Sequence, residues 1–179
     1  MSRDELTPFS YVVMALIGRD GAGPHDIKRM AQRGRTYWVA GESQYYTEPK
    51  RLARLGYLEA TKQTGRTRER THYTLTPRGL DALRDWAWRP SSFPRMQQEG
   101  AVRLIVADLV GEAPVRASIA AMRTEIADIA AMLDVAEEAA STLPHRERYL
   151  RLNHRLSRRL LDAYAGWIDE VERELSADR

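Results

Sequence analysis

The chain has 179 residues, of which 43% are hydrophobic and 30% charged. This composition is typical of a folded globular protein and excludes a wholly disordered chain. No apolar run approaches the roughly 20 residues of a membrane-spanning helix, and the opening residues lack the basic-then-apolar order of a secretion signal. The absence of cysteine excludes disulfides, thiol catalysis and cysteine-based zinc sites. We therefore expect a cytoplasmic protein.

Charge is divided unevenly along the chain. Residues 1–89 carry 16 basic and 10 acidic side chains, whereas residues 90–179 carry 12 and 15. A basic half joined to an acidic half is typical of a chain whose first half meets a polyanion, and ordinary statistical scatter is the alternative. The prolines and serines that follow Arg89 are typical of a domain boundary. We expect one domain over residues 1–89, a linker at 90–95 and a second domain over 96–179.

The first two predicted helices are short. Thr7 is suited to cap a helix and Pro8 to occupy its first turn, after which apolar residues recur at helical spacing until Gly18. A second helix is expected after the turn that contains Pro24, and Gly34 is expected to end it.

The third predicted helix carries polar and basic side chains on its outer face. Ser43 is suited to cap it, and the helix is expected to end near Leu55, just before a glycine. Pro49 is a difficulty, because proline in a helix interior removes a hydrogen bond and clashes with the preceding turn. Either the helix is kinked there, or its regular part begins nearer Thr47.

A β-hairpin and a fourth helix complete the first half. Residues 57–62 and 71–75 are rich in β-branched and aromatic side chains, and Gly65 lies in the polar connection between them. Thr76 and Pro77 repeat the cap-and-proline pattern and predict a helix directly after the hairpin.

The second half is predicted to be helical throughout. We expect a short helix over about 97–110, a longer one after the separator at 111–114, and a last one after Pro144. Apolar residues recur every three or four positions along the last helix, so it is strongly amphipathic. Two helices alone make a poor core, which favours a dimer over a monomer packed on its own first domain. The expected dimer-interface residues are Leu152, Leu156, Leu160, Tyr164, Trp167 and Val171.

Three helices, a hairpin and a fourth helix within about 85 residues are the order of a winged helix-turn-helix domain. The expected fold class is mainly α with a small β-hairpin wing, followed by a helical dimerisation domain. In such a domain the third helix reads base edges and the wing contacts phosphates. The expected DNA-binding residues are Ser43, Gln44, Tyr46, Thr47, Lys50, Arg51, Arg54, Lys62, Arg66, Arg68 and Arg70.

Four segments of the sequence resemble the PadR family of transcriptional regulators. They are residues 6–16, 23–28, 43–58 and 64–79, and the Tyr46 position and the Lys50-Arg51-Leu52 run carry much of the specificity. The family often has Gly-Ser in place of Ser43-Gln44, and Leu in place of Pro49. The resemblance implies a homodimeric repressor that binds an inverted-repeat operator in double-stranded DNA. It also implies release from DNA when a small, often aromatic, effector binds.

A flat effector could stack on aromatic side chains near the connector and the domain junction. The expected effector-binding residues are Tyr37, Trp38, Trp86, Trp88 and Phe93. Aromatics at apolar spacing more often belong to a core, which is the alternative for each of them.

Catalysis is not expected. The four histidines lack metal-ligand spacing, and the sequence has neither a phosphate-binding loop nor a nucleophile elbow. We therefore expect no enzyme activity, no metal and no cofactor. The alternative functions are a winged-helix module that assembles with other proteins without specific DNA binding, and a DNA-binding regulator from another winged-helix family.

Overall fold

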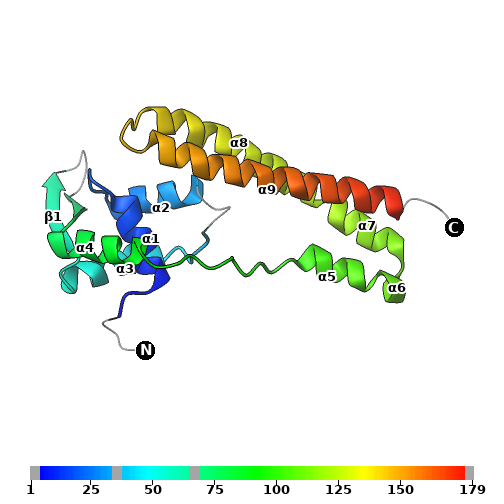
Figure 1. The fold of residues 1–179 in the computed structure, drawn as a ribbon, viewed down its shortest axis with the longest axis horizontal. Coiled ribbons are helices and arrows are strands. Elements are labelled where there is room, and N and C mark those ends of the chain that lie inside the picture. The colour runs from blue at the N-terminus through cyan, green and yellow to red at the C-terminus, as the bar shows by residue number, and fades with distance from the viewer. Residues whose placement is uncertain (1–4, 34–37, 65–68, 176–179) are drawn as a thin grey trace. The chain divides into compact units, whose positions relative to one another are not determined.

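The computed structural model describes residues 5–33, 38–64 and 69–175, and the chain divides into two units (Figure 1). One unit extends to Phe93 and the other begins at Pro94. Within the described ranges, no helix has the combination of length and hydropathy that crossing a membrane requires. Each unit has its own hydrophobic core.

Over its described residues, the first unit contains four helices and a two-stranded antiparallel sheet. Both helix starts that a threonine and a proline predicted are confirmed: the hydroxyl of Thr7 accepts from Ser10 N, and that of Thr76 accepts from Gly79 N. The expected end of the second helix at Gly34 lies outside the described residues. The elements are α1 (Pro8–Ile17), α2 (Pro24–Arg33), α3 (Gln44–Arg54), β1 (Leu58–Thr64), β2 (Glu69–Leu75) and α4 (Pro77–Ala87).

The core of the first unit forms where α1, α2 and α3 meet the base of the hairpin. Met14 of α1, Ile27 of α2 and Leu52 of α3 are fully buried in one cluster. Tyr73 of β2 joins this cluster, and its backbone exchanges two hydrogen bonds of 3.0 Å with Ala22 in the turn between α1 and α2. The hairpin is thus attached to the helices through both side chain and backbone.

The strands of the hairpin are longer than the sequence predicted. They pair from Leu58 with Leu75 to Thr64 with Glu69. The polar residues at the outer end therefore continue the ladder, although their composition resembles that of a loop. Cross-strand hydrogen bonds extend the pairing beyond the buried part of the hairpin.

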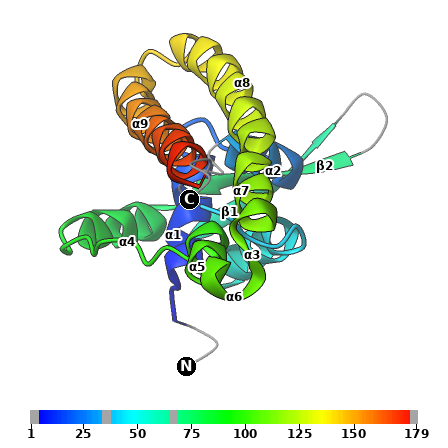
Figure 2. The same ribbon diagram turned by 90° about the vertical axis from the view of Figure 1, so that its right-hand side faces the viewer.

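The described part of the second unit, residues 94–175, contains five helices (Figures 1 and 2). The helix expected over 97–110 is two short helices that meet at Val106. The separator expected at 111–114 is reduced to Gly111, because the next helix begins at Glu112. Pro114 is the third residue of its helix, where a missing backbone N–H breaks no helical hydrogen bond. The elements are α5 (Glu99–Ile105), α6 (Ala107–Val110), α7 (Glu112–Ala120), α8 (Met122–Ser141) and α9 (Glu147–Glu174).

The α8 and α9 helices run side by side as an antiparallel pair (Figure 2). Leu133 and Ala140 of α8 and Leu161 of α9 are buried. At the other end of α9, Ile168 and Val171 pack against Val115 and Ile119 of α7. The inward face of α9 is therefore covered within the chain over most of its length.

Candidate nucleic-acid interface

The α3 helix is anchored by three buried side chains on one face. Tyr45, Pro49 and Leu52 point into the core of the first unit. The helix begins at Gln44, so Pro49 lies inside it, and the alternative start near Thr47 is not what the structure shows. The proline costs one helical hydrogen bond, and its complete burial in the core offsets part of that cost.

The start of α3 differs from the expected serine cap. Ser43 occupies the capping position, but its side chain makes no capping hydrogen bond. Gln44 stabilises the turn instead, because its side-chain oxygen accepts from Gly41 N at 3.1 Å. The Thr47 hydroxyl donates to the Ser43 carbonyl at 3.1 Å. Ser43 and Gln44 are both exposed at the first turn of the helix.

The outer face of α3 presents a row of exposed polar and basic side chains. Thr47, Lys50 and Arg54 follow one another at intervals of three and four residues, which places them on one side of the helix. They line a concavity of about 500 Å³ together with Glu48 and Arg51. Tyr46, on the flank of this row, is half-buried. The cationic groups of Lys50 and Arg54 match the acceptors of phosphates and base edges.

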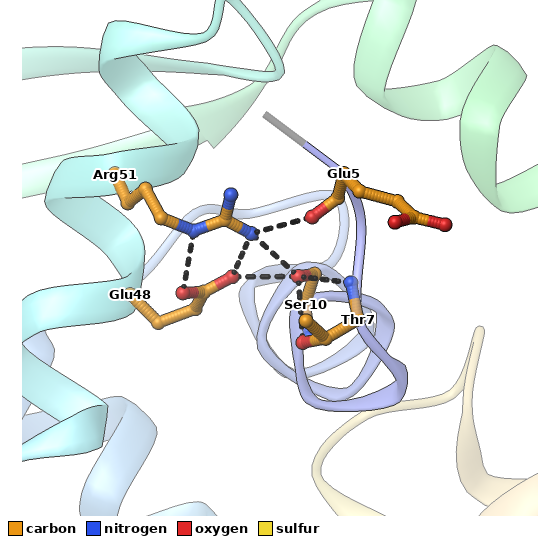
Figure 3. Close-up of polar contacts among 5 residues, drawn as sticks. All are labelled: Glu5, Thr7, Ser10, Glu48 and Arg51. Carbon is orange, nitrogen blue, oxygen red and sulfur yellow. Dashed lines mark hydrogen bonds and ion pairs between the residues drawn. The ribbon is translucent and has the colours of Figure 1, made fainter. Parts of the chain in front are cut away.

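Arg51 occupies a different position from Lys50 and Arg54. Its Nε donates to Glu48 Oε2 at 2.9 Å and its Nη2 donates to Glu48 Oε1 at 2.8 Å (Figure 3). Nη2 also donates to Ser10 Oγ at 3.0 Å and to the Glu5 carbonyl at 3.3 Å. The guanidinium of Arg51 thus joins α3 to α1, and the expected DNA-binding role of Arg51 stays a prediction.

The wing contributes two of its expected cations to the described surface. Lys62 and Arg70 are both exposed, but the pairing of Gln63 with Arg70 puts them on opposite faces of the hairpin. Lys62 also forms an exposed ion pair of 3.0 Å with Glu69. The two cations therefore do not share one face of the hairpin. Arg66 and Arg68 lie outside the described residues.

The expected effector-binding aromatics do not form one group. Trp38 stacks on Phe9, with ring centroids 6.4 Å apart, and is partly buried. Trp86 stacks on Tyr11, whereas Trp88 and Phe93 are almost fully exposed beyond the end of α4. Tyr37 lies outside the described residues. Trp38 and Trp86 thus belong to the packing of the first unit, as the core alternative predicts.

The expected dimer residues on α9 fall into two groups. Leu152 and Leu156 are 49% and 55% exposed. Leu160, Tyr164 and Trp167 are half-buried, and Trp167 packs against the α7 cluster of its own chain. Val171 is buried in that cluster, which corrects its assignment to a dimer surface.

Two features of the surface were missed by reasoning from the sequence. Val102, Ile105 and Leu109 on α5 and α6 are 61–79% exposed, although their spacing gave a signal that a helical wheel could have used. The expectations drawn from the sequence gave Glu48 no role. Its pairing with Ser10 spans 38 residues and left no local sequence signal.

Among the described residues, no three His, Cys, Asp or Glu side chains gather as a metal site requires. The buried His154 is the histidine most removed from water. Its Nδ1 has no hydrogen-bond partner within the described ranges, and burial lowers its pKa. The described part of the candidate interface on the first unit instead presents hydrogen-bond donors and cationic side chains.

The fold occurs in solved structures of transcriptional regulators. Bacillus subtilis PadR, solved in complex with operator DNA, aligns with a TM-score of 0.73 at 19% identity, over 95% of this chain and 98% of that chain. The Vibrio cholerae virulence activator AphA aligns with a TM-score of 0.71 at 24% identity, over 98% and 99% of the two chains. The PadR-like regulator BC1756 from Bacillus cereus gives 0.75 at 14% identity, over 96% and 100%.

Bacillus subtilis PadR has also been solved in complex with p-coumaric acid. No protein-family model matches the present sequence, and a search of curated proteins finds no match either. At these identities the likeness establishes the fold. The chain is a winged helix-turn-helix unit followed by a helical unit, in the arrangement of elements found in PadR-type regulators.

Proposed function

We propose that this protein is a PadR-family transcriptional regulator that binds a specific DNA sequence through α3 and the wing. The observation that carries this proposal is the exposed row of Thr47, Lys50 and Arg54 on a helix whose opposite face is anchored in the core. Arg and Lys recognise guanine and phosphate, and a threonine hydroxyl bonds to either bases or phosphates. The operator complex of Bacillus subtilis PadR supports a DNA partner for this fold.

The proposed regulator acts as a homodimer. Tyr149, Leu152 and Leu156 of α9 leave an apolar surface uncovered, and so do α5 and α6. Exposed apolar surface of this kind is typical of a protein–protein interface. A second copy of the chain would cover it and would present two reading helices to an inverted-repeat operator. Repression follows from occupying a promoter.

Release from DNA by a small aromatic compound is the further part of the proposal. The complex of Bacillus subtilis PadR with p-coumaric acid supports an effector of this class. Among the described aromatics expected to bind an effector, Trp88 and Phe93 are the most exposed, at 89% and 85%, and can stack on one. Substituting Trp88 by alanine should weaken binding of p-coumaric acid, measured by quenching of tryptophan fluorescence in the remaining indoles.

The test of the DNA-binding surface is an anisotropy titration against duplex DNA from upstream of the protein's own gene, with random duplex as competitor. Lys50→Ala and Arg54→Ala should each weaken specific binding by about 1–3 kcal/mol. Arg155→Ala removes the same charge from an exposed site on α9 and should leave affinity unchanged. Equal binding by all three variants would overturn the assignment of the reading face.

Salt dependence separates this function from protein assembly. A complex held by several phosphates loses affinity with a log–log slope near −0.9 per phosphate, and an apolar protein interface hardly responds. If Lys50 contacts a phosphate, Lys50→Ala should reduce that slope by about 1. A salt-insensitive complex, or no preference for any duplex, would favour the protein-assembly function.

A further inference from the structure

Three side chains join α3, the helix proposed to contact bases, to the first turn of α1. Ser10 Oγ donates to Glu48 Oε1 at 2.6 Å, and Arg51 donates to both Glu48 and Ser10 (Figure 3). Arg51 also reaches the Glu5 carbonyl, so the segment before α1 is included. We call Ser10, Glu48 and Arg51 the α1–α3 clamp.

The Ser10 hydroxyl lies at the centre of the α1–α3 clamp, and both its donor and its acceptor positions are used. Ser10 is completely buried, and its hydroxyl proton goes to Glu48. Its oxygen accepts from Thr7 N at 2.9 Å and from Arg51 Nη2 at 3.0 Å, which uses both lone pairs of a hydroxyl. Apolar contacts alone permit small rotations of a helix, whereas hydrogen bonds of fixed geometry favour one orientation.

The charge of Glu48 has no direct benefit for binding a polyanion. Its carboxylate lies on the flank of the same concavity as Lys50 and Arg54, and its side chain is only 13% exposed. Both of its oxygens accept from Arg51. The Glu48–Arg51 pair is therefore close to neutral toward DNA. Of the three cationic side chains in this part of α3, it occupies Arg51 and leaves Lys50 and Arg54. We therefore attribute the carboxylate at this position to its hydrogen bonds with Ser10 and Arg51.

We propose that the α1–α3 clamp determines sequence specificity by fixing the rotation of α3, so that Ser10, Glu48 and Arg51 act as positioning residues. Base readout requires side chains held to within about 0.5 Å and 10–20° of the productive geometry. In some proteins a buried polar group fixes one arrangement at a cost in stability, and the α1–α3 clamp is proposed to act in this way. This inference rests on the proposed function, since it concerns how the same helix distinguishes base sequences.

Two substitutions separate positioning from contact. Ser10→Ala changes no charge and alters a side chain that no DNA can touch. Glu48→Gln removes a negative charge, so electrostatics alone predicts tighter binding to every duplex. The clamp predicts weaker binding to the selected sequence. The ratio of its affinity to that of random duplex should fall about tenfold, which is the effect of one mismatched base pair. Glu42→Gln is the matched control, because Glu42 precedes α3, is exposed and lies outside the clamp.

The experiment is an enrichment of bound sequences from a random duplex library by the wild-type chain, its three single variants and the Ser10→Ala/Glu48→Gln double variant. We expect the wild type and Glu42→Gln to enrich one motif. Ser10→Ala and Glu48→Gln should enrich a degenerate form of it. The double variant should lose no more specificity than either single one, because the two side chains act through one network.

A residue that only stabilised the fold would lower the unfolding temperature and leave the enriched motif unchanged. That result for Ser10→Ala and Glu48→Gln would overturn the proposal. Amide hydrogen exchange of the free protein provides a second measurement: exchange over residues 44–54 should accelerate in both variants, and exchange in α4 should not. Unchanged exchange in α3 would also overturn the clamp. A wild type that enriches no motif would overturn the proposed function itself. The exchange measurement is made without DNA, so it tests the clamp independently of that function.

Discussion

The indole of Trp86 in α4 lies parallel to the ring of Tyr11 in α1, with centroids 4.9 Å apart and the planes inclined by 7°. This stack fastens the last helix of the first unit to its first helix. The same side chain was expected to bind an effector, and its ring face is occupied by Tyr11 instead. A role in packing follows directly from that contact.

Replacing Trp86 by alanine should therefore destabilise the first unit. Burial of a large aromatic and its stacking together predict a loss of about 2 kcal/mol, less than for a fully buried tryptophan because Trp86 is 42% exposed. Trp88→Ala, at a site 89% exposed two residues away, is the matched control and should change stability by less than about 0.5 kcal/mol. Urea unfolding followed by circular dichroism measures both, and equal losses would contradict the packing role.

Two glycines predict stability changes of opposite sign. A methyl group added at Gly79 would lie 2.2 Å from the Tyr57 carbonyl oxygen, a distance that forces α4 away from the turn before β1. Gly79→Ala should cost about 2 kcal/mol or more. Gly166 lies exposed inside α9 with nothing near its added methyl, so Gly166→Ala should stabilise by about 0.5–1 kcal/mol. Thermal unfolding of the two variants in parallel tests both predictions, and destabilisation by both substitutions would contradict the prediction for Gly166.

The buried His154 predicts a pH dependence of stability. Burial is the largest cause that lowers its pKa, opposed by Glu137 and reinforced by Arg158 and Arg151. As pH falls through about 6.5, the unfolded chain binds a proton on this imidazole that the folded chain does not bind until lower pH. Stability should therefore be fully present above that value and decline as pH falls from 7 toward 5.5.

His154→Gln should flatten this decline, and His25→Gln, at an exposed position in α2, should retain it. Urea unfolding at pH 7.0, 6.25 and 5.5 measures the effect. The hydrogen bond from Arg158 lowers the pKa of Glu137, so that carboxylate adds its own loss of stability at lower pH than this range. An undiminished decline in His154→Gln would assign the pH dependence to other groups.

The dimer proposal predicts that a charge on the exposed side of α9 separates the copies. Leu156→Asp should yield a particle of the 20.5 kDa chain mass, whereas the wild type should show twice that mass in sedimentation or light scattering. Val135→Asp is the matched control, because Val135 on α8 is equally exposed at 55% and lies outside the predicted stripe. A wild type that is monomeric at micromolar concentration would overturn the dimer.

Local signals predicted most of the elements of this chain. Thr7 and Thr76 cap helices as expected, because capping depends on residues within three positions of each other. Pro114 misled the prediction of a break, since a proline has opposite meanings in the first turn and in the interior of a helix. Pro49 shows the reverse case, in which burial in the core keeps a proline inside a helix.

The candidate site was predictable in composition and not in detail. The basic face of α3 was visible in the order of residues, and the structure places Thr47, Lys50 and Arg54 there together. The periodicity could not show that Arg51 turns toward Glu48 and Ser10, because that choice depends on a side chain 41 positions away. A helical wheel reports which residues share a face and contains no information about what lies opposite.

The sequence by itself determined the order of helices and strands, the polar face of α3 and the amphipathic character of α9, all of which arise from short-range spacing. Only the tertiary structure decided which cation is held by the clamp and which apolar residues stay exposed. Val171 and Leu156 belong to the same predicted stripe, yet one is buried by α7 and the other is uncovered. The reason is physical: burial and ion pairing depend on neighbours that long-range packing supplies, and residues distant in the chain share no local pattern.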